Sequence, residues 1–132
     1  MAGSGAGDER GASLSALVAT VMAALFLTAG LVVDGSAQAQ AHRRAEVAAA
    51  RAVRQGSDST AARRLVGQDG TAEGLAAARA VLADEGVDGE VLVEQGMITA
   101  RTRTSAPTTF LALLGIDALE ATGSASAELR RA

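Results

Sequence analysis

The side chains that most often do chemistry in proteins are few in this sequence. There is no Cys, and His42 is the single histidine, so neither a thiolate nucleophile nor a multi-histidine metal site can form. His42 precedes Arg43 and Arg44 on a predicted solvated helix face, where no serine and carboxylate converge on it as a catalytic triad requires. We therefore expect no catalytic, cofactor-binding or metal site and no enzyme activity.

Most acidic side chains fit a solvated surface. Glu90 and Glu94 flank a predicted strand and Asp84 and Glu85 close a predicted helix, and neither pair has the apolar pocket that separates two carboxylate pKa values in acid-base catalysis. Asp34 differs because it directly follows a long apolar segment. Two interpretations stay open for it: a polar stop at a membrane interface, or a specific contact in an assembly.

Composition excludes several binding functions. The chain of 132 residues carries 12 basic and 15 acidic residues, a net charge of -3, so it has no basic excess for a nucleic-acid backbone. Aromatic residues make up 2% of the chain, too few for platforms on which bases or sugars stack. We expect neither a nucleic-acid partner nor a small-molecule substrate, and the length suits one domain.

The segment 11–33 predicts a transmembrane helix, which makes the lipid bilayer the first expected partner. It has no charged side chain and lies between Arg10 and Asp34. At about 1.5 Å per residue it spans roughly 34 Å, enough to cross a hydrocarbon core of about 30 Å. A buried core helix is the alternative, but so small a domain has too little protein to surround it. A cleaved secretory signal is a second alternative, with small-x-small sites ending at Ala39 and Ala41.

Within the span, small residues recur at every fourth position, including Ala16, Thr20 and Ala24. Such a stripe lets another helix approach closely, although an Ala-rich composition also produces it by chance. Orientation is not fixed by charge: Arg43, Arg44 and their neighbours favour a cytoplasmic C-terminal part, but a segment as long as 34–132 is translocated largely regardless of charge.

Beyond Gly35 the sequence is a strong helix former, so the membrane helix is expected to continue to Arg54 and to stop at Gly56. The side chains expected on one face of this extension are Ala37, Ala41, Ala45, Ala48, Ala49, Ala52 and Val53. A loop with a short helical turn follows at 55–74, and then a helix at 71–85, capped by Thr71 and ended by Gly86.

The pattern then changes from helical to alternating. Residues 89–94 and 97–104 predict a hairpin with a Gln95-Gly96 turn, and 119–129 predicts a half-buried strand. Between them, a short apolar helical segment is expected from Pro107 to Gly115. The prediction is an α+β fold, in which a long N-terminal helix precedes a helix and a three-stranded antiparallel sheet. Its parts are a short flexible N-terminus (1–10), a transmembrane helix (11–33), a helix extension (34–55) and a small α+β domain (56–132).

In this order the motifs resemble those of the TadE/TadG-like proteins of Flp (Tad) pilus-assembly systems, in particular the short actinobacterial type. The matching elements are Arg10-Gly11 before the span, a Gly-Leu-x-Val-Asp pattern at 30–34, an Ala-rich helix, Pro107, Gly115-Ile116-Asp117 and a final strand rich in Thr, Ala and Gly. The resemblance implies other Tad/Flp pilus-assembly proteins as partners and a C-terminal domain outside the cell membrane.

One position departs from the pilin-like members of that family, which are cleaved after a glycine with Glu five residues beyond it. If Gly11 is that glycine, the fifth residue is Ala16. The resemblance thus implies a membrane-anchored minor pilin-like or accessory component, either processed at Gly11 or permanently anchored. The alternative is a signal-processed small extracellular binding domain unrelated to pili.

Overall fold

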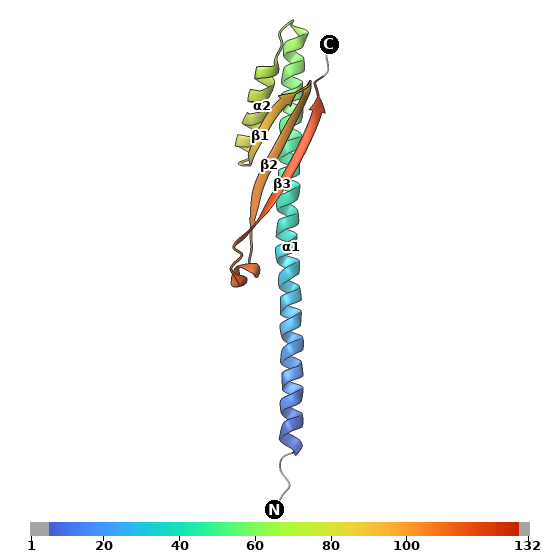
Figure 1. Ribbon diagram of the computed structural model, residues 1–132, viewed down its shortest axis with the longest axis vertical. Coiled ribbons are helices and arrows are strands. Elements are labelled where there is room, and N and C mark those ends of the chain that lie inside the picture. The colour runs from blue at the N-terminus through green and yellow to red at the C-terminus, as the bar shows by residue number, and fades with distance from the viewer. Residues whose placement is uncertain (1–5, 130–132) are drawn as a thin grey trace, which may run out of the picture.

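The computed structural model describes residues 6–129, with side chains from residue 11 onward. One helix, α1 (Ala6–Leu65), runs the length of the molecule, and the other elements gather beside its C-terminal half (Figure 1). They are α2 (Thr71–Asp84), β1 (Asp88–Glu94), β2 (Met97–Pro107), the 3-10 helix η1 (Leu111–Leu114) and β3 (Ala118–Glu128). The predicted α+β fold is confirmed. Of the predicted flexible N-terminus, residues 1–5 lie outside the described part and 6–10 are helical.

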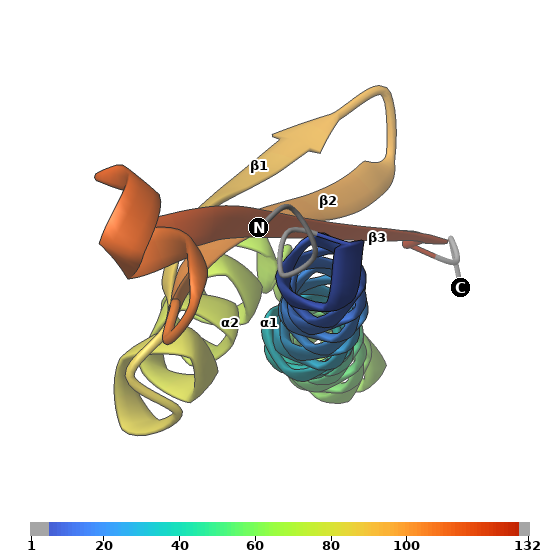
Figure 2. The ribbon, with the colours of Figure 1, turned by 90° about the horizontal axis from the view of Figure 1, so that it is seen from below.

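The three strands form an antiparallel sheet in the order β1-β2-β3. Both helices lie against the same face of this sheet (Figure 2), which gives a two-layer arrangement. In the sheet register Ala100 of β2 stands between Val91 of β1 and Ala125 of β3. All three turn their side chains toward the helices, since side chains at paired positions share a face.

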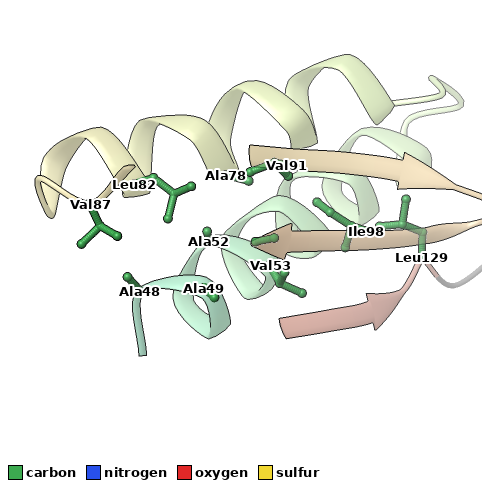
Figure 3. Packing of buried hydrophobic residues seen from close by; sticks show 11 residues of the cluster. Ala48, Ala49, Ala52, Val53, Ala78, Leu82, Val87, Val91, Ile98 and Leu129 are labelled. Atoms are coloured by element: carbon green, nitrogen blue, oxygen red, sulfur yellow. The ribbon is translucent and has the colours of Figure 1, made fainter. Parts of the chain in front are cut away.

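The core forms where the Ala-rich face of α1 meets the sheet and α2 (Figure 3). Ile98 and Val91 are the largest fully buried apolar side chains, so the core has little bulk and depends on close approach of backbones. At Gly123 of β3 a Cβ atom would lie only 2.4 Å from the carbonyl carbon of Ala45. The predicted inner face of α1 is confirmed, with buried Ala41, Ala45, Ala48, Ala49, Ala52 and Val53 and partly buried Ala37.

The predicted helix stop at Gly56 is wrong, because α1 continues without a break to Leu65. Gly56 is buried where α1 crosses α2, and a Cβ atom there would lie 2.5 Å from Ile98 Cδ1 and 2.9 Å from the Gly74 carbonyl oxygen. The glycine therefore serves close packing and not termination. The loop predicted at 55–74 shrinks to the few residues between Leu65 and Thr71.

Thr71 does not cap α2 either. The N-cap is Gly70 in a left-handed conformation, and the Thr71 hydroxyl donates instead to Asp69 Oδ1 at 3.1 Å. Gly86 ends the helix as predicted, with a φ of 62°. The Gln95-Gly96 turn is confirmed too: both residues have positive φ values, 50° and 77°, as a type I′ hairpin turn requires.

Pro107 is the last residue of β2 and not the first of a helix. The helical segment that follows is shorter than predicted and begins at Leu111, but it ends at Gly115 as predicted, with a φ of 85°. The connection between β2 and β3 is therefore a compact loop, which extends along α1 toward its N-terminal half (Figure 1).

The segment 11–33 of α1 extends beyond the domain. Every residue in this segment is exposed except Gly30, and Leu14, Leu25, Leu27 and Leu31 each expose 60% or more of their surface. This segment is apolar around its whole circumference, and apart from Gly30 the domain leaves it uncovered. The helix is thus long and apolar enough to span a membrane.

The contact between Gly123 and α1 can be tested by adding one methyl group. We expect Gly123→Ala to lower the free energy of unfolding of the domain by about 1–3 kcal/mol, because the Cβ atom must push β3 away from the α1 backbone. Urea unfolding followed by circular dichroism measures the change. Gly35→Ala is the control: a Cβ there meets open space, so stability should hold or rise by about 0.5–1 kcal/mol. Equal midpoints for both variants would contradict the contact.

Candidate functional site

The most specific polar contact of the molecule joins Asp34 of α1 to the β2-β3 connection. Its carboxylate accepts three backbone hydrogen bonds, from Thr109 at 2.8 Å, Phe110 at 3.0 Å and Leu111 at 2.7 Å. The Asp34 residue retains only 2% of its surface exposed. An isolated carboxylate at the end of the apolar segment of α1 would be costly to bury, and these three donors replace the water it loses.

The three amides need an acceptor because of where they lie. The first N–H groups of a helix have no partner within it, and Phe110 is the N-cap of η1. Asp34, 75 residues earlier in the chain, supplies oxygens to this end in the way that a capping carboxylate does. The loop is closed at its neck by the amide of Thr108, which donates to the Asp117 carbonyl at 3.0 Å.

One helical turn before Asp34, Gly30 receives the side chain of Phe110. A Cβ atom on Gly30 would lie 2.6 Å from Phe110 Cγ, so only glycine lets the side chain lie this close to the helix. Gly30 and Asp34 together form the surface of α1 on which the start of η1 packs. We call this contact the Asp34 junction (Gly30, Asp34 and residues 109–111).

The hydrogen bonds at the junction favour the ionised carboxylate. The bond from the Thr109 amide is the largest cause that holds the pKa of Asp34 below its ordinary value near 3.8. Burial acts in the opposite direction, and the amides of Leu111 and Phe110 lower the pKa further. A lowered pKa in the folded state means that the contact is complete above pH 3.8 and is lost only as the pH falls through that lower value.

The sequence left open whether Asp34 is an interfacial stop or a contact in an assembly. The structure places both carboxylate oxygens in hydrogen bonds within the chain, an intrachain role that neither interpretation included, and the contact of Asp34 in an assembly stays a prediction. Sequence reasoning missed Gly30, Phe110 and the three amides.

The other predicted site residues lie along the exposed segment of α1. Gly11 is inside the helix, with open space where a Cβ would stand. Ala16, Thr20 and Ala24 are exposed on the helix surface, and the Thr20 hydroxyl donates to the Ala16 carbonyl at 2.8 Å. That bond satisfies the hydroxyl within the helix, which suits an apolar surrounding.

His42 lies away from the junction, at the border of an open polar groove of about 680 Å³. Its Nε2 is 3.6 Å from the carboxylate of Glu46, and Glu90, Arg101 and Arg103 of the sheet line the same groove. No cluster of three or more metal-ligating side chains occurs among the side chains that the structure describes, those of residues 11–129. The groove combines both signs of charge, and the hydroxyl of Thr102, a buried residue in its lining, donates to the Ala45 carbonyl.

Comparisons with protein families, curated proteins and solved structures found no match to this chain.

The Asp34 junction can be tested by hydrogen exchange. We expect Asp34→Ala to speed exchange of the amides at 109–111 on the order of tenfold, because three N–H donors lose a charged acceptor. Mass spectrometry of peptides covering 105–117 reads this out, while peptides from β1 should not change. Asp58→Asn, an exposed acid on the same helix, is the control. Unchanged exchange at 109–111 in Asp34→Ala would refute the contact.

Proposed function

We propose that this protein is a non-enzymatic, membrane-anchored minor pilin-like or accessory component of Flp/Tad pilus assembly. In this proposal α1 crosses the cell membrane once, and the α+β domain lies outside the cell. The protein acts by helix packing in the bilayer and by contacts of its domain with other pilus-assembly proteins.

One observation carries the proposal: a single unbroken helix is bare and apolar over residues 11–33 and forms the spine of a folded domain over its second half. Exposure of so large an apolar surface to water is unfavourable and marks a site of membrane or protein contact. The arrangement of one long helix with a small antiparallel sheet packed on its C-terminal half supports the pilin-like interpretation. The order of the motifs described above adds the resemblance to TadE/TadG-like proteins.

The alternative, a signal-processed extracellular domain, is harder to reconcile with the packing. Cleavage after Ala39 or Ala41 would remove Asp34 and Gly30 from the domain. The amides at 109–111 would lose their acceptor, and Phe110 would lose the helix surface it covers. Ala41 is itself buried, against Ala106 and Ala121.

The mass of the native protein distinguishes these processing routes. We expect a form that keeps residues 12–132 at least and stays in the membrane fraction after alkaline carbonate extraction, because an uncharged span of this length does not leave a bilayer once inserted. Intact-mass measurement also separates cleavage after Gly11 from no cleavage. Recovery of a soluble form that begins near residue 40 would support the signal-peptide alternative instead.

Topology can be tested with one cysteine, because the chain has none. Ser124 on β3 is exposed, so we expect Ser124→Cys to react with an impermeant maleimide in intact cells. Ala19→Cys, within the apolar segment, should stay unlabelled and serves as the control. Labelling of residue 124 only after lysis would place the domain in the cytoplasm.

The small-residue stripe is tested by adding bulk to it. If another helix packs at Ala16, Thr20 and Ala24, the double variant Ala16→Leu/Ala24→Leu should weaken co-purification with Tad components by severalfold without altering membrane insertion. The matched control is Ala19→Leu/Ala29→Leu, which adds the same bulk at exposed positions about 100° and about 180° around the helix from Thr20, the centre of the stripe. An equal response of the two double variants would mean that the stripe is not a packing face.

A further inference from the structure

The β2-β3 connection carries apolar side chains that nothing in the domain covers. Leu113 and Leu114 of η1 expose 83% and 75% of their surface, and Ile116 exposes 44%. Between Arg103 and Asp117 the sequence has no charged residue. Thr108, the loop's entry, keeps its hydroxyl bonded to the Ile116 carbonyl. The tip of the connection (residues 110–116) is therefore an exposed, uncharged and apolar projection.

The height of this tip along α1 is fixed by two contacts. Phe110 packs on Gly30, and the amides at 109–111 bind Asp34. About 20 helical residues cross a hydrocarbon core of about 30 Å, so a core that begins at Gly11 ends close to Gly30. The tip thus lies beside the end of the apolar segment, level with the expected boundary between acyl chains and headgroups (Figure 1).

We propose that the tip of the connection inserts into the lipid interface as a second membrane contact beside α1. The proposal rests on the membrane insertion of α1 in the proposed function. We infer that lipid covers the tip, because its exposed apolar surface lies at the same level along the α1 axis as the exposed Leu31, Val32 and Val33. If lipid surrounds these residues of α1, it also surrounds the tip, which lies beside them at the same depth.

A second contact changes what the anchor can do. A single straight helix leaves the domain free to rotate about the helix axis and to tilt with it. Insertion of Leu113 and Leu114 to one side of α1 fixes the azimuth of the domain relative to the membrane plane. The Asp34 junction passes this constraint to the helix, because it joins the tip to α1 through three hydrogen bonds.

The absence of Trp and Tyr from the chain allows a direct test with single tryptophan probes. Leu114→Trp is placed in the full-length protein, reconstituted alone in phosphatidylcholine nanodiscs, and its fluorescence is quenched either by brominated acyl chains or by aqueous acrylamide. We expect strong quenching by bromolipid, weak quenching by acrylamide and an emission maximum shifted to the blue. Leu65→Trp is the matched control: it is 82% exposed at the far end of α1 and should be quenched by acrylamide alone.

Phe26→Trp, in the middle of the apolar segment, separates the two claims. If bromolipid quenches residue 26 and not residue 114, the loop insertion is refuted while the membrane anchor stands. If bromolipid quenches neither residue 26 nor residue 114, both the membrane anchor and the loop insertion are refuted. Shielding of residue 114 from acrylamide without bromolipid quenching would assign the tip to a protein contact and would also overturn the lipid proposal.

Tryptophan itself favours membrane interfaces, so a second probe with little such preference completes the test. Leu114→Cys should react with a water-soluble maleimide at least several times more slowly in nanodiscs than Leu65→Cys. The difference should vanish in the variant Leu113→Asp/Leu114→Cys, whose charge opposes insertion. Equal rates for Leu114→Cys and Leu65→Cys would contradict the insertion.

Discussion

An ionised carboxylate that directly follows an apolar helical segment must find donors or remain in water, and Asp34 accepts hydrogen bonds from three backbone amides of its own chain. These amides lie at the start of η1 and have no acceptor within it. The carboxylate supplies their acceptor, and they supply its donors. The position of the contact decides the shape of the molecule. It holds the β2-β3 connection at the height where the apolar segment of α1 ends and leaves the segment before it bare.

Small residues make the remainder of the fold possible. α1 and β3 meet at Ala45 and Gly123, and α1 and α2 meet at Gly56 and Gly74, where a Cβ atom on any of the glycines would overlap its neighbours. Thr102 adds a buried hydroxyl that donates to the Ala45 carbonyl at 2.7 Å. Because the domain has few bulky side chains to bury, close packing against α1 forms much of its core. The C-terminal half of α1 is therefore part of the domain, and its N-terminal half is the anchor.

Patterns with a short period were predictable from the sequence. The apolar segment 11–33, the alternating strands and the Gln95-Gly96 turn all depend on neighbouring residues, and the structure bears them out. Gly56 was misread, because a helix stop and a close helix crossing both call for glycine and only the tertiary contact with Ile98 distinguishes them. The partner of Asp34 lies 75 residues away, beyond any local pattern, so its role as a cap could not be read from the sequence.

The titration of Asp34 in the reconstituted protein tests this account most directly. Carbon NMR of the side-chain carboxyl, assigned by its loss in Asp34→Asn, follows ionisation while the amide resonance of Phe110 reports the contact. The account predicts that Asp34 titrates below 3.8 and that the Phe110 amide shifts with the same midpoint. A carboxyl that titrates at or above that value, with a Phe110 amide that does not respond, would contradict it.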